Sequence, residues 1–428
     1  MSLIGKLIDK LISRGSVTLI RPGNAPETYG PGGGKQLTVR FTDRKVAFDI
    51  LKNPRLGVGE AYMDGRLVVE DGTILDLLEL IVGSNRWEDK GEGRKALSKG
   101  KNRLKRVFRR NNFRRARRNV AHHYDLKDEL YELFLDEDKQ YSCAYFTDPS
   151  NSLEQAQADK KAHIAAKLAL EPGQRVLDIG CGWGGMALYL NKVADVDVLG
   201  ITLSEEQLKL ARERAAAAGV SDRVKFELID YRQLDGRFDR IVSIGMFEHV
   251  GAAQYDEFYA KCRELLTDDG VMLLHTIGKL GGAGKPDPFT DKWIFPGYHL
   301  PALSQMCSSS EKVKMIVSDV ETLRVHYAYT LRHWLDRATK ARAAIEKLYD
   351  ARFFRMWEFY LAGGIVMFES GAACNYQVQY VRDRRALPLT RDYMLETERR
   401  YREIGGKPSA AKKSGSTKRK KALEEADA

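Results

Sequence analysis

The chain has 428 residues, of which 43% are hydrophobic and 30% are charged, and its formal net charge is +11. This length predicts two or three domains, and the composition excludes a chain that is disordered throughout. The five cysteines are scattered without CxxC spacing. We therefore expect neither a disulfide framework nor a metal site built on cysteines.

The first part of the chain predicts a small α+β domain over residues 1–90. Apolar residues at helical spacing predict a helix over 3–12. Such a stripe could lie on a membrane, but we expect it to dock on its own domain. Short apolar stretches follow at 17–20 and 37–41, separated by a Pro- and Gly-rich connection, and residues 74–82 have a helical pattern.

Two basic segments carry the positive charge. Residues 94–118 contain thirteen Lys and Arg and no acidic residue, and residues 407–421 contain seven more, which leaves a net charge of −9 for the rest. Segments of this kind bind nucleic acid or an anionic bilayer, unless they are merely solvated. We expect residues 91–120 to form a basic linker or helix, and residues 406–428 to form a disordered basic tail.

We expect the next domain over residues 121–400, and from about Leu153 its sequence alternates between strand and helix patterns. This alternation predicts an α/β fold with a doubly wound, mostly parallel sheet. The expected helices cover residues 186–193, 204–218 and 254–266. The expected strands cover residues 175–180, 196–203, 224–230, 239–246 and 271–278.

The central motif is RVLDIGCGWGG, in which a hydrophobic strand leads through glycines into a helix. Gly180 and Gly182 would let the backbone approach a cofactor at the carboxyl end of the first strand, and Asp178 precedes these glycines. A nicotinamide-binding loop is the main alternative. However, the glycines lack GxGxxG spacing, and no acidic residue ends the second strand.

The motif DIGCGWG resembles that of class I S-adenosylmethionine-dependent methyltransferases, which have a Rossmann-like sheet of seven strands. Further motifs occur in the order found in cyclopropane-fatty-acyl-phospholipid synthases, and LGVGEAYMDGRL (56–67) is similar to the first domain of that family. These motifs are YSCAYF (141–146), GITLSEEQ (200–207), DYR (230–232), GMFEHVG (245–251), HTIG (275–278), WIFPGYHLP (293–301) and HYAYTLRHW (326–334). The resemblance covers most of residues 1–390.

The resemblance implies transfer of a methylene group from S-adenosylmethionine to a cis double bond in a phospholipid acyl chain. The alkene takes the sulfonium methyl group, a base removes a proton from it, and the three-membered ring closes. Such chemistry needs close reactants and a base sheltered from water. In this family the base is attributed to bicarbonate, held at positions that correspond here to Cys143, Glu248, His275, Ile277 (through its backbone) and Tyr327.

Each of these residues also has a purely structural interpretation. Cys143 could be a small buried thiol and Tyr327 a packing residue. Glu248 could lie on the surface, as most acidic residues do, and His275 could be a core histidine that is simply hydrogen-bonded. The order of the motifs favours the catalytic interpretation. An anion beside Glu248 requires a shared proton.

The cofactor set also follows from the resemblance. Gly180 and Gly182 would face the methionine part, and the adenine would meet Asp230 and Tyr231, with the Asp carboxylate accepting from the exocyclic amino group. The ribose region would be contacted by Thr202, Leu203 and Gln207, and the cofactor would also have Tyr141 and Ser142 near it. No metal ion is expected.

One position departs from the family. Some members carry a cysteine after a Tyr-Leu pair that was once proposed as a nucleophile, whereas this chain has Gly363 and Gly364 there. The nearest cysteine, Cys374, lies ten residues on. Methyl transfer to an alkene needs no nucleophilic cysteine, so we expect Cys374 to be a packing residue.

We therefore predict a lipid methyltransferase that binds an anionic phospholipid bilayer and an unsaturated phospholipid, with a homodimer left open. The interrupted apolar run at the N-terminus predicts no signal peptide, and Phe359–Phe368 is too short to span a bilayer. We expect a cytoplasmic protein, peripheral at the inner face of the cytoplasmic membrane.

Three alternatives stay open. A nucleic-acid methyltransferase would use the basic segments, although GMFEHVG replaces the Asp/Asn-Pro-Pro-aromatic motif of enzymes that methylate base amines, so we expect no nucleic-acid partner. A scaffold protein would not need the catalytic set. An enzyme that adds a methyl or methylene branch would differ only in the fate of the carbocation.

Overall fold

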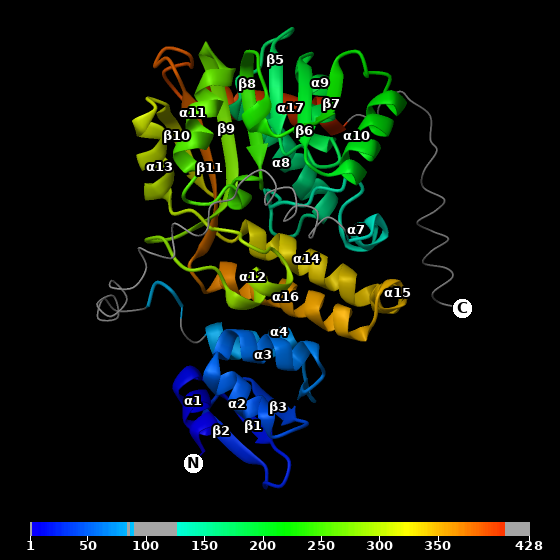
Figure 1. Ribbon diagram of the computed structural model, residues 1–428, viewed down its shortest axis with the longest axis vertical. Helices are drawn as coiled ribbons and strands as arrows, with labels where there is room; N and C mark the ends of the chain where they lie inside the picture. The colour runs from blue at the N-terminus through cyan, green and yellow to red at the C-terminus, as the bar shows by residue number, and fades with distance from the viewer. Residues whose placement is uncertain (1, 84–85, 90–125, 407–428) are drawn as a thin grey trace. The chain divides into compact units, whose positions relative to one another are not determined.

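The computed structural model describes residues 2–83, 86–89 and 126–406, which form two compact units (Figure 1). The first unit combines the described residues up to 89 with Gly284–Tyr298 and Tyr327–Cys374. The second combines the described residues from 126 to Ala283 with His299–His326 and those from Asn375 to 406.

The first unit has a four-stranded sheet in the order β2-β1-β3-β4. Its elements are α1 (Leu3–Leu11), β1 (Gly15–Ile20), β2 (Glu27–Gly32), β3 (Gln36–Phe41), α2 (Lys45–Lys52), α3 (Pro54–Met63), β4 (Leu67–Val69), α4 (Ile74–Val82), α12 (Pro288–Trp293), α14 (His326–Lys340), α15 (Arg342–Leu348) and α16 (Ala351–Glu369). The helices predicted over 3–12 and 74–82 are confirmed.

Strand β2 lies inside the Pro- and Gly-rich stretch that we interpreted as a connection. It pairs antiparallel with β1, with Tyr29 opposite Val17. Gly30 and Gly32 have φ values of +100° and +79°, which favour glycine. The glycines therefore belong to an irregular strand, and local composition concealed the pairing.

Helix α1 docks on its own unit, as predicted. Ile4 and Ile12 are buried in the same hydrophobic core as β1, β3 and α4. Phe289 and Phe359, which lie far along the chain, also join this core, and their ring centroids are 4.7 Å apart. The structure thus places parts of residues 121–400 with the N-terminal elements, because a domain of about 80 residues has limited core of its own.

The second unit contains a seven-stranded sheet in the order β10-β11-β9-β8-β5-β6-β7. Its elements are α7 (Asp128–Phe134), α8 (Leu153–Lys167), β5 (Arg175–Ile179), α9 (Gly185–Ala194), β6 (Asp197–Thr202), α10 (Glu205–Ala217), β7 (Val224–Leu228), η3 (Tyr231–Gln233), β8 (Phe238–Ile244), η4 (Phe247–His249), α11 (Tyr255–Leu265), β9 (Leu266–Lys279), α13 (Leu303–Lys312), β10 (Ile316–Thr322), β11 (Ala373–Val381) and α17 (Asp392–Gly406). The predicted fold class is confirmed.

The five predicted strands correspond to β5–β9, and the sequence missed β10 and β11. Strands β5, β6, β7, β8 and β9 pair in parallel, whereas β10 is antiparallel to β11. Helices lie on both faces of the sheet (Figure 1). Parallel strands covered on both faces bring their carboxyl ends to one edge, where open α/β sheets bind ligands.

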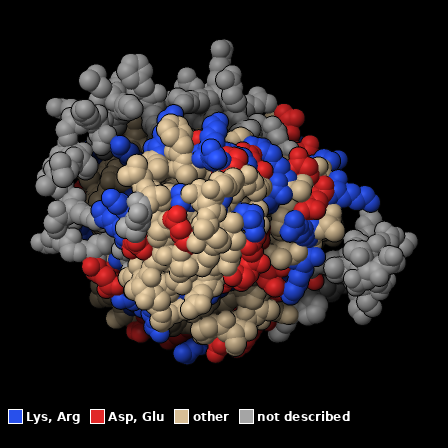
Figure 2. Space-filling view, turned by 90° about the horizontal axis from the view of Figure 1, so that it is seen from below, with Lys and Arg blue, Asp and Glu red and all other residues tan. Residues whose placement is uncertain are grey.

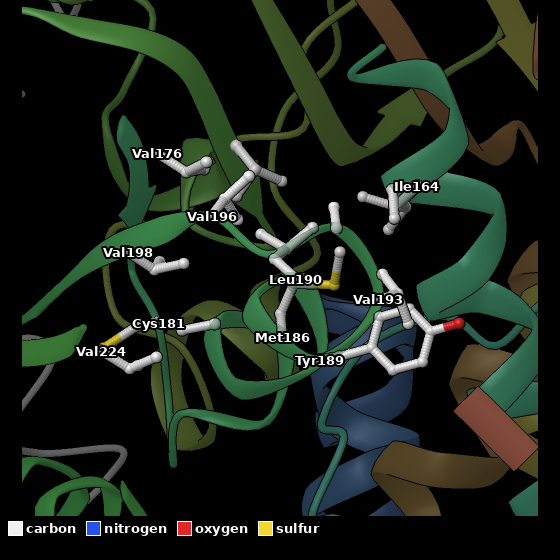
Figure 3. Close-up of a cluster of buried hydrophobic side chains, with 14 of the residues drawn as sticks. Ile164, Val176, Cys181, Met186, Tyr189, Leu190, Val193, Val196, Val198 and Val224 are labelled. Carbon is white, nitrogen blue, oxygen red and sulfur yellow. The ribbon is translucent and has the colours of Figure 1, made fainter. Parts of the chain in front are cut away.

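A hydrophobic cluster fixes α9 and α8 against this sheet (Figure 3). Val176 and Val198 come from neighbouring strands, and Leu190 and Val193 come from α9. Ile164 of α8 completes the cluster. This packing holds β5 and α9, the two elements that the glycine loop connects, so both ends of the loop are fixed.

Some predictions concern parts of the chain outside the described residues. The basic linker expected over 91–120 lies entirely there, as does the tail from residue 407 onward. Residue 406, the first of the expected tail, ends helix α17. Among the described residues, no helix combines the length and apolar character needed to cross a membrane.

Candidate active site

The glycine loop leads from β5 into α9 with an unusual backbone. Gly180, Gly182 and Gly184 have φ values of +83°, +55° and +81°, in the region that side chains other than glycine rarely adopt. A Cβ atom built on Gly180 would lie 2.9 Å from Met246, whereas one on Gly182 would meet no atom within 4 Å. The backbone at Gly182 therefore borders open space that a ligand can approach.

Strand β6 ends at the second group of predicted cofactor residues. The Thr202 hydroxyl donates to Gln207 Oε1 at 2.8 Å, and both side chains are buried. Ser204 caps α10 by accepting from the Gln207 backbone amide. Leu203 lies between Thr202 and Ser204 in the sequence and is half-buried. Thr202 and Gln207 thus share one hydrogen bond beside the turn where a ribose is expected.

Asp230 and Tyr231 follow β7, but Asp230 already has a partner. Its carboxylate accepts from Arg232 Nε at 2.9 Å and from Nη2 at 2.6 Å. The Tyr231 ring packs edge-on against Phe258, with centroids 5.4 Å apart. Sequence reasoning missed Arg232, whose guanidinium competes for the carboxylate oxygens that we expected to face adenine.

Lys160 of α8 is a buried cation that the sequence analysis also missed. Its Nζ donates to Gln140 Oε1 at 2.6 Å and to Ser142 Oγ at 2.9 Å. Burial lowers the pKa of Lys160 to about 8, although Asp136 opposes this effect. The hydrogen bond from Lys160 thereby fixes the Ser142 hydroxyl. The neighbouring Tyr141 packs against Tyr131, with ring centroids 5.4 Å apart.

Asp178 lies one residue before the end of β5 and is fully buried. Its Oδ2 atom has no hydrogen-bond partner among the described residues. Burial raises the pKa of Asp178 to about 7, against the attraction of Lys160. A buried oxygen without a partner is costly, so a ligand that donates a hydrogen bond here would be favoured.

Glu248 and Ile277, both predicted to be catalytic, are brought together. Glu248 lies in η4, after β8, and its Oε1 accepts from the Ile277 backbone amide at 2.6 Å. Its Oε2 is buried without a partner among the described residues. Burial raises the pKa of Glu248 to about 7, although the Ile277 amide opposes this rise. The surface alternative for Glu248 is therefore excluded.

His275 stands two residues before Ile277 on β9, opposite Ile244 of β8. Its ring is buried and faces the side-chain amides of Asn375 and Gln377. Burial, followed by the charges of Lys160 and Lys167, lowers the pKa of His275 to about 3. The ring is therefore neutral at physiological pH.

The other two predicted residues are also buried. Cys143 Sγ donates to the Ala144 carbonyl at 3.3 Å. Tyr327 belongs to the first unit, where its ring contacts Phe368 with a centroid distance of 4.8 Å. It follows His326, which accepts from the Phe146 backbone amide at 3.0 Å in the second unit. Within the described residues, no group of three His, Cys, Asp or Glu could hold a metal ion.

Comparison with known proteins identifies the family. The model of the mycolic acid cyclopropane synthetase family matches residues 111–378, which is more than half of the chain. The chain belongs to this family.

Two curated relatives and one solved structure illustrate the similarity. Over 357 residues, the chain is 37% identical to a cyclopropane-fatty-acyl-phospholipid synthase of Escherichia coli, covering 83% of this chain and 87% of the relative. It is 42% identical over 287 residues to a probable fatty acid methyltransferase of Pseudomonas putida, covering 64% and 73%. The crystal structure of the mycolic acid cyclopropane synthase CmaA1 with SAH and CTAB has 35% identity and a TM-score of 0.59, covering 62% of this chain and 97% of that one.

This member of the cyclopropane synthetase family is thus an S-adenosylmethionine-dependent methyltransferase. Sequence reasoning missed Lys160, Arg232, Asn375 and Gln377 as polar groups of the site. One signal was present, because amides alternate with apolar residues over 375–380, as in a strand with one polar face. Lys160 gave no such signal, because the burial of a charged residue on a helix depends on partners that lie far from it in the sequence.

Gly182→Val should weaken binding of S-adenosylmethionine by at least about tenfold, or ~1.4 kcal/mol, because a branched side chain would enter the open space at the loop. Titration calorimetry measures this loss. Gly173→Val is the matched control, since Gly173 has a φ of +79° and open surroundings but lies outside the loop. Equal affinity in the two variants would contradict the assignment of the loop.

Proposed function

We propose that this enzyme transfers a methylene group from S-adenosylmethionine to the cis double bond of an unsaturated phospholipid acyl chain, forming a cyclopropane ring. The observation that carries the proposal is the extent of similarity. The match to the Escherichia coli phospholipid enzyme covers 83% of this chain, whereas the match to cyclopropane mycolic acid synthase 1 of Mycobacterium tuberculosis covers 59%. The extra similarity favours a phospholipid over a mycolic acid.

The same site suits a second candidate reaction, in which the methyl branch is kept and no ring forms. The 42% identity to the probable fatty acid methyltransferase of Pseudomonas putida favours this alternative. The two reactions share the acyl chain, the cofactor and the carbocation. They differ in which proton leaves, so the groups around the carbocation decide the product.

We propose that Cys143, Glu248, His275, Tyr327 and the backbone of Ile277 hold bicarbonate. The donor chemistry fits an anion, because below pH 7 Glu248 is mostly protonated and can donate from the carboxyl group whose Oε2 has no partner among the described residues. When bound, bicarbonate would supply a base for the proton that leaves the new methyl group. The protein's part is to exclude water and to hold that proton acceptor in a buried, polar setting.

Expression in a host that makes monounsaturated phospholipids tests the reaction. We expect monounsaturated acyl chains to gain the mass of one CH₂ group in lipid mass spectra. Cyclopropane proton signals would identify the ring, whereas a methyl doublet or an exocyclic methylene signal would identify the branching alternative. Unchanged lipids with a protein that binds S-adenosylmethionine would contradict both reactions.

Glu248→Gln and Tyr327→Phe should keep the affinity for S-adenosylmethionine and lose most of the turnover, because Gln cannot release or take up the carboxyl proton that Glu248 would share with the anion, and Phe lacks the hydroxyl donor of Tyr327. Depletion of bicarbonate should slow the wild type. Wild-type turnover should also fall as the pH rises through about 7, where Glu248 loses its proton, and Glu248→Gln should lack that dependence. Tyr329→Phe, two residues along α14, is the control expected to retain turnover. Full activity in both test variants would remove these residues from the mechanism.

We also propose that the enzyme works at the surface of an anionic bilayer, at the inner face of the cytoplasmic membrane. The sequence of residues 94–118 supplies thirteen cations with Leu104, Val107 and Phe108 among them. Each cation near an anionic surface contributes about 1 kcal/mol. The first unit adds apolar surface, since Leu3 of α1 is 72% exposed and Phe48 of α2 is 63% exposed. Figure 2 shows uncharged residues at the centre of one face, with charged residues around them.

Vesicle sedimentation tests the surface proposal. Neutralising seven of the thirteen cations in 94–118 should abolish binding to phosphatidylglycerol vesicles and activity on them, while leaving cofactor affinity unchanged. Wild-type binding should weaken at high salt and on neutral vesicles. Neutralising the seven cations in 407–421 is the matched control and should have a smaller effect. Retained binding after the first change, or tighter wild-type binding to RNA than to vesicles, would contradict the proposal.

A further inference from the structure

Both ring nitrogens of His275 face the nitrogen of a side-chain amide from β11. Asn375 Nδ2 lies 3.1 Å from Nε2, and Gln377 Nε2 lies 3.2 Å from Nδ1. An amide nitrogen only donates hydrogen bonds, and a neutral imidazole has one donor and one acceptor. Both contacts therefore cannot be hydrogen bonds at once, so one amide must present its oxygen to the ring.

Lys167 fixes the orientation of the Gln377 side-chain amide. Its Nζ lies 2.7 Å from Gln377 Oε1 and also donates to the carboxylate of Glu321. An ammonium group only donates, so a reversed Gln377 amide would point its NH₂ group at another donor. The oxygen of Gln377 therefore faces Lys167, and its NH₂ group faces Nδ1 of His275.

The proton of the ring follows from this orientation. Nδ1 must accept the hydrogen bond from Gln377, so the neutral ring of His275 carries its proton on Nε2. The low pKa of His275, about 3, agrees with a neutral ring. Two residues on other elements, a lysine on α8 and a glutamine on β11, thus select the tautomer.

Asn375 is consistent with this assignment only when its amide is turned through 180°. Its Oδ1 is buried and has no partner among the described residues, while its Nδ2 faces the Nε2–H group. The turned amide accepts from Nε2–H through Oδ1. Before the turn, two donors face each other and the Asn375 carbonyl oxygen has no donor. After the turn, the only unmade interaction of this amide is that of its NH₂ group, which costs less.

Lys167 is itself held by a buried charge network. Glu321 of β10 also contacts His163 Nε2 at 2.7 Å, and His163 Nδ1 lies 2.9 Å from Glu398 of α17. The His163 ring stacks on Tyr145, with centroids 3.9 Å apart and planes within 9°. Residues of α8, β10 and α17 therefore form the network that restrains the ammonium group of Lys167.

We propose that Lys167 and Gln377 are positioning residues that hold His275 as the Nε2–H tautomer. His275 cannot accept a proton at Nδ1 without displacing the NH₂ group of Gln377, and its Nε2–H group donates to Asn375, so the ring is held neutral and the role of base falls to another group. The assignment of the tautomer does not depend on the proposed function. Only the statement that His275 takes part in the reaction rests on it.

The tautomer can be measured by ¹H–¹⁵N spectra of protein labelled at histidine, with His275 assigned by its loss in His275→Gln. The wild type should show a protonated Nε2 and an unprotonated Nδ1. Gln377→Glu replaces the NH₂ donor with an oxygen, so the proton should move to Nδ1 or both nitrogens should become protonated. We expect turnover to fall by at least about tenfold, with the affinity for S-adenosylmethionine unchanged.

Gln379→Glu is the matched control, because Gln379 lies two residues along β11 and donates to the Lys167 carbonyl and to Tyr393 instead. It should leave the His275 tautomer unchanged. Lys167→Arg keeps a donor to Gln377 and should preserve the tautomer, whereas Lys167→Met should yield a mixture. The methionine variant carries the test if Gln377→Glu does not fold.

The inference is overturned if wild-type His275 carries its proton on Nδ1, or if folded Gln377→Glu keeps the wild-type tautomer and turnover. These results are separate from the fate of the proposed function. If the wild type leaves unsaturated phospholipids unchanged, the proposed reaction fails, while the spectra still decide whether Lys167 and Gln377 set the tautomer.

Discussion

Burial of ionisable side chains beside the sheet is the constraint on which the active site depends. Asp178, Glu248, His275 and Lys160 are all withdrawn from water. Removing a charge from water costs several kcal/mol unless a partner compensates. Burial therefore brings the pKa values of both carboxyl groups to about 7 and that of the lysine to about 8. For each of these three groups, the charged and neutral forms are therefore close in free energy near neutral pH.

The parallel sheet turns this constraint into a defined geometry. Strands β8 and β9 are paired neighbours. Glu248 follows the end of β8, and its carboxylate accepts a hydrogen bond from the backbone amide of Ile277 on β9. Helix α8 then supplies the cations from beside the sheet. Lys160 and Lys167 are seven residues apart, so they lie two turns apart on one face of α8. One holds Ser142 near the cofactor loop, and the other holds the amide that faces His275.

The first unit shows how a small domain acquires enough core. Its N-terminal elements bury Phe289 and Phe359 from segments more than 200 residues away. The first unit therefore takes part of its core from segments that follow the glycine loop in the sequence, and not from its N-terminal elements alone.

The sequence by itself determined the α/β fold, five strands of the large sheet, the glycine loop and the family, because periodicity and motif order are properties of local sequence. It also predicted that Glu248 and Ile277 belong to one site. Only the tertiary structure decided that Arg232 occupies the carboxylate of Asp230, and that Lys167 reaches Gln377 across 210 residues. Strand β10 and its antiparallel pairing with β11 were equally hidden, whereas the alternation over 375–380 was a signal for β11 that we missed. Such pairings depend on which distant groups share a buried volume, and the free energy of burying a charge is set by those partners rather than by its neighbours in the chain.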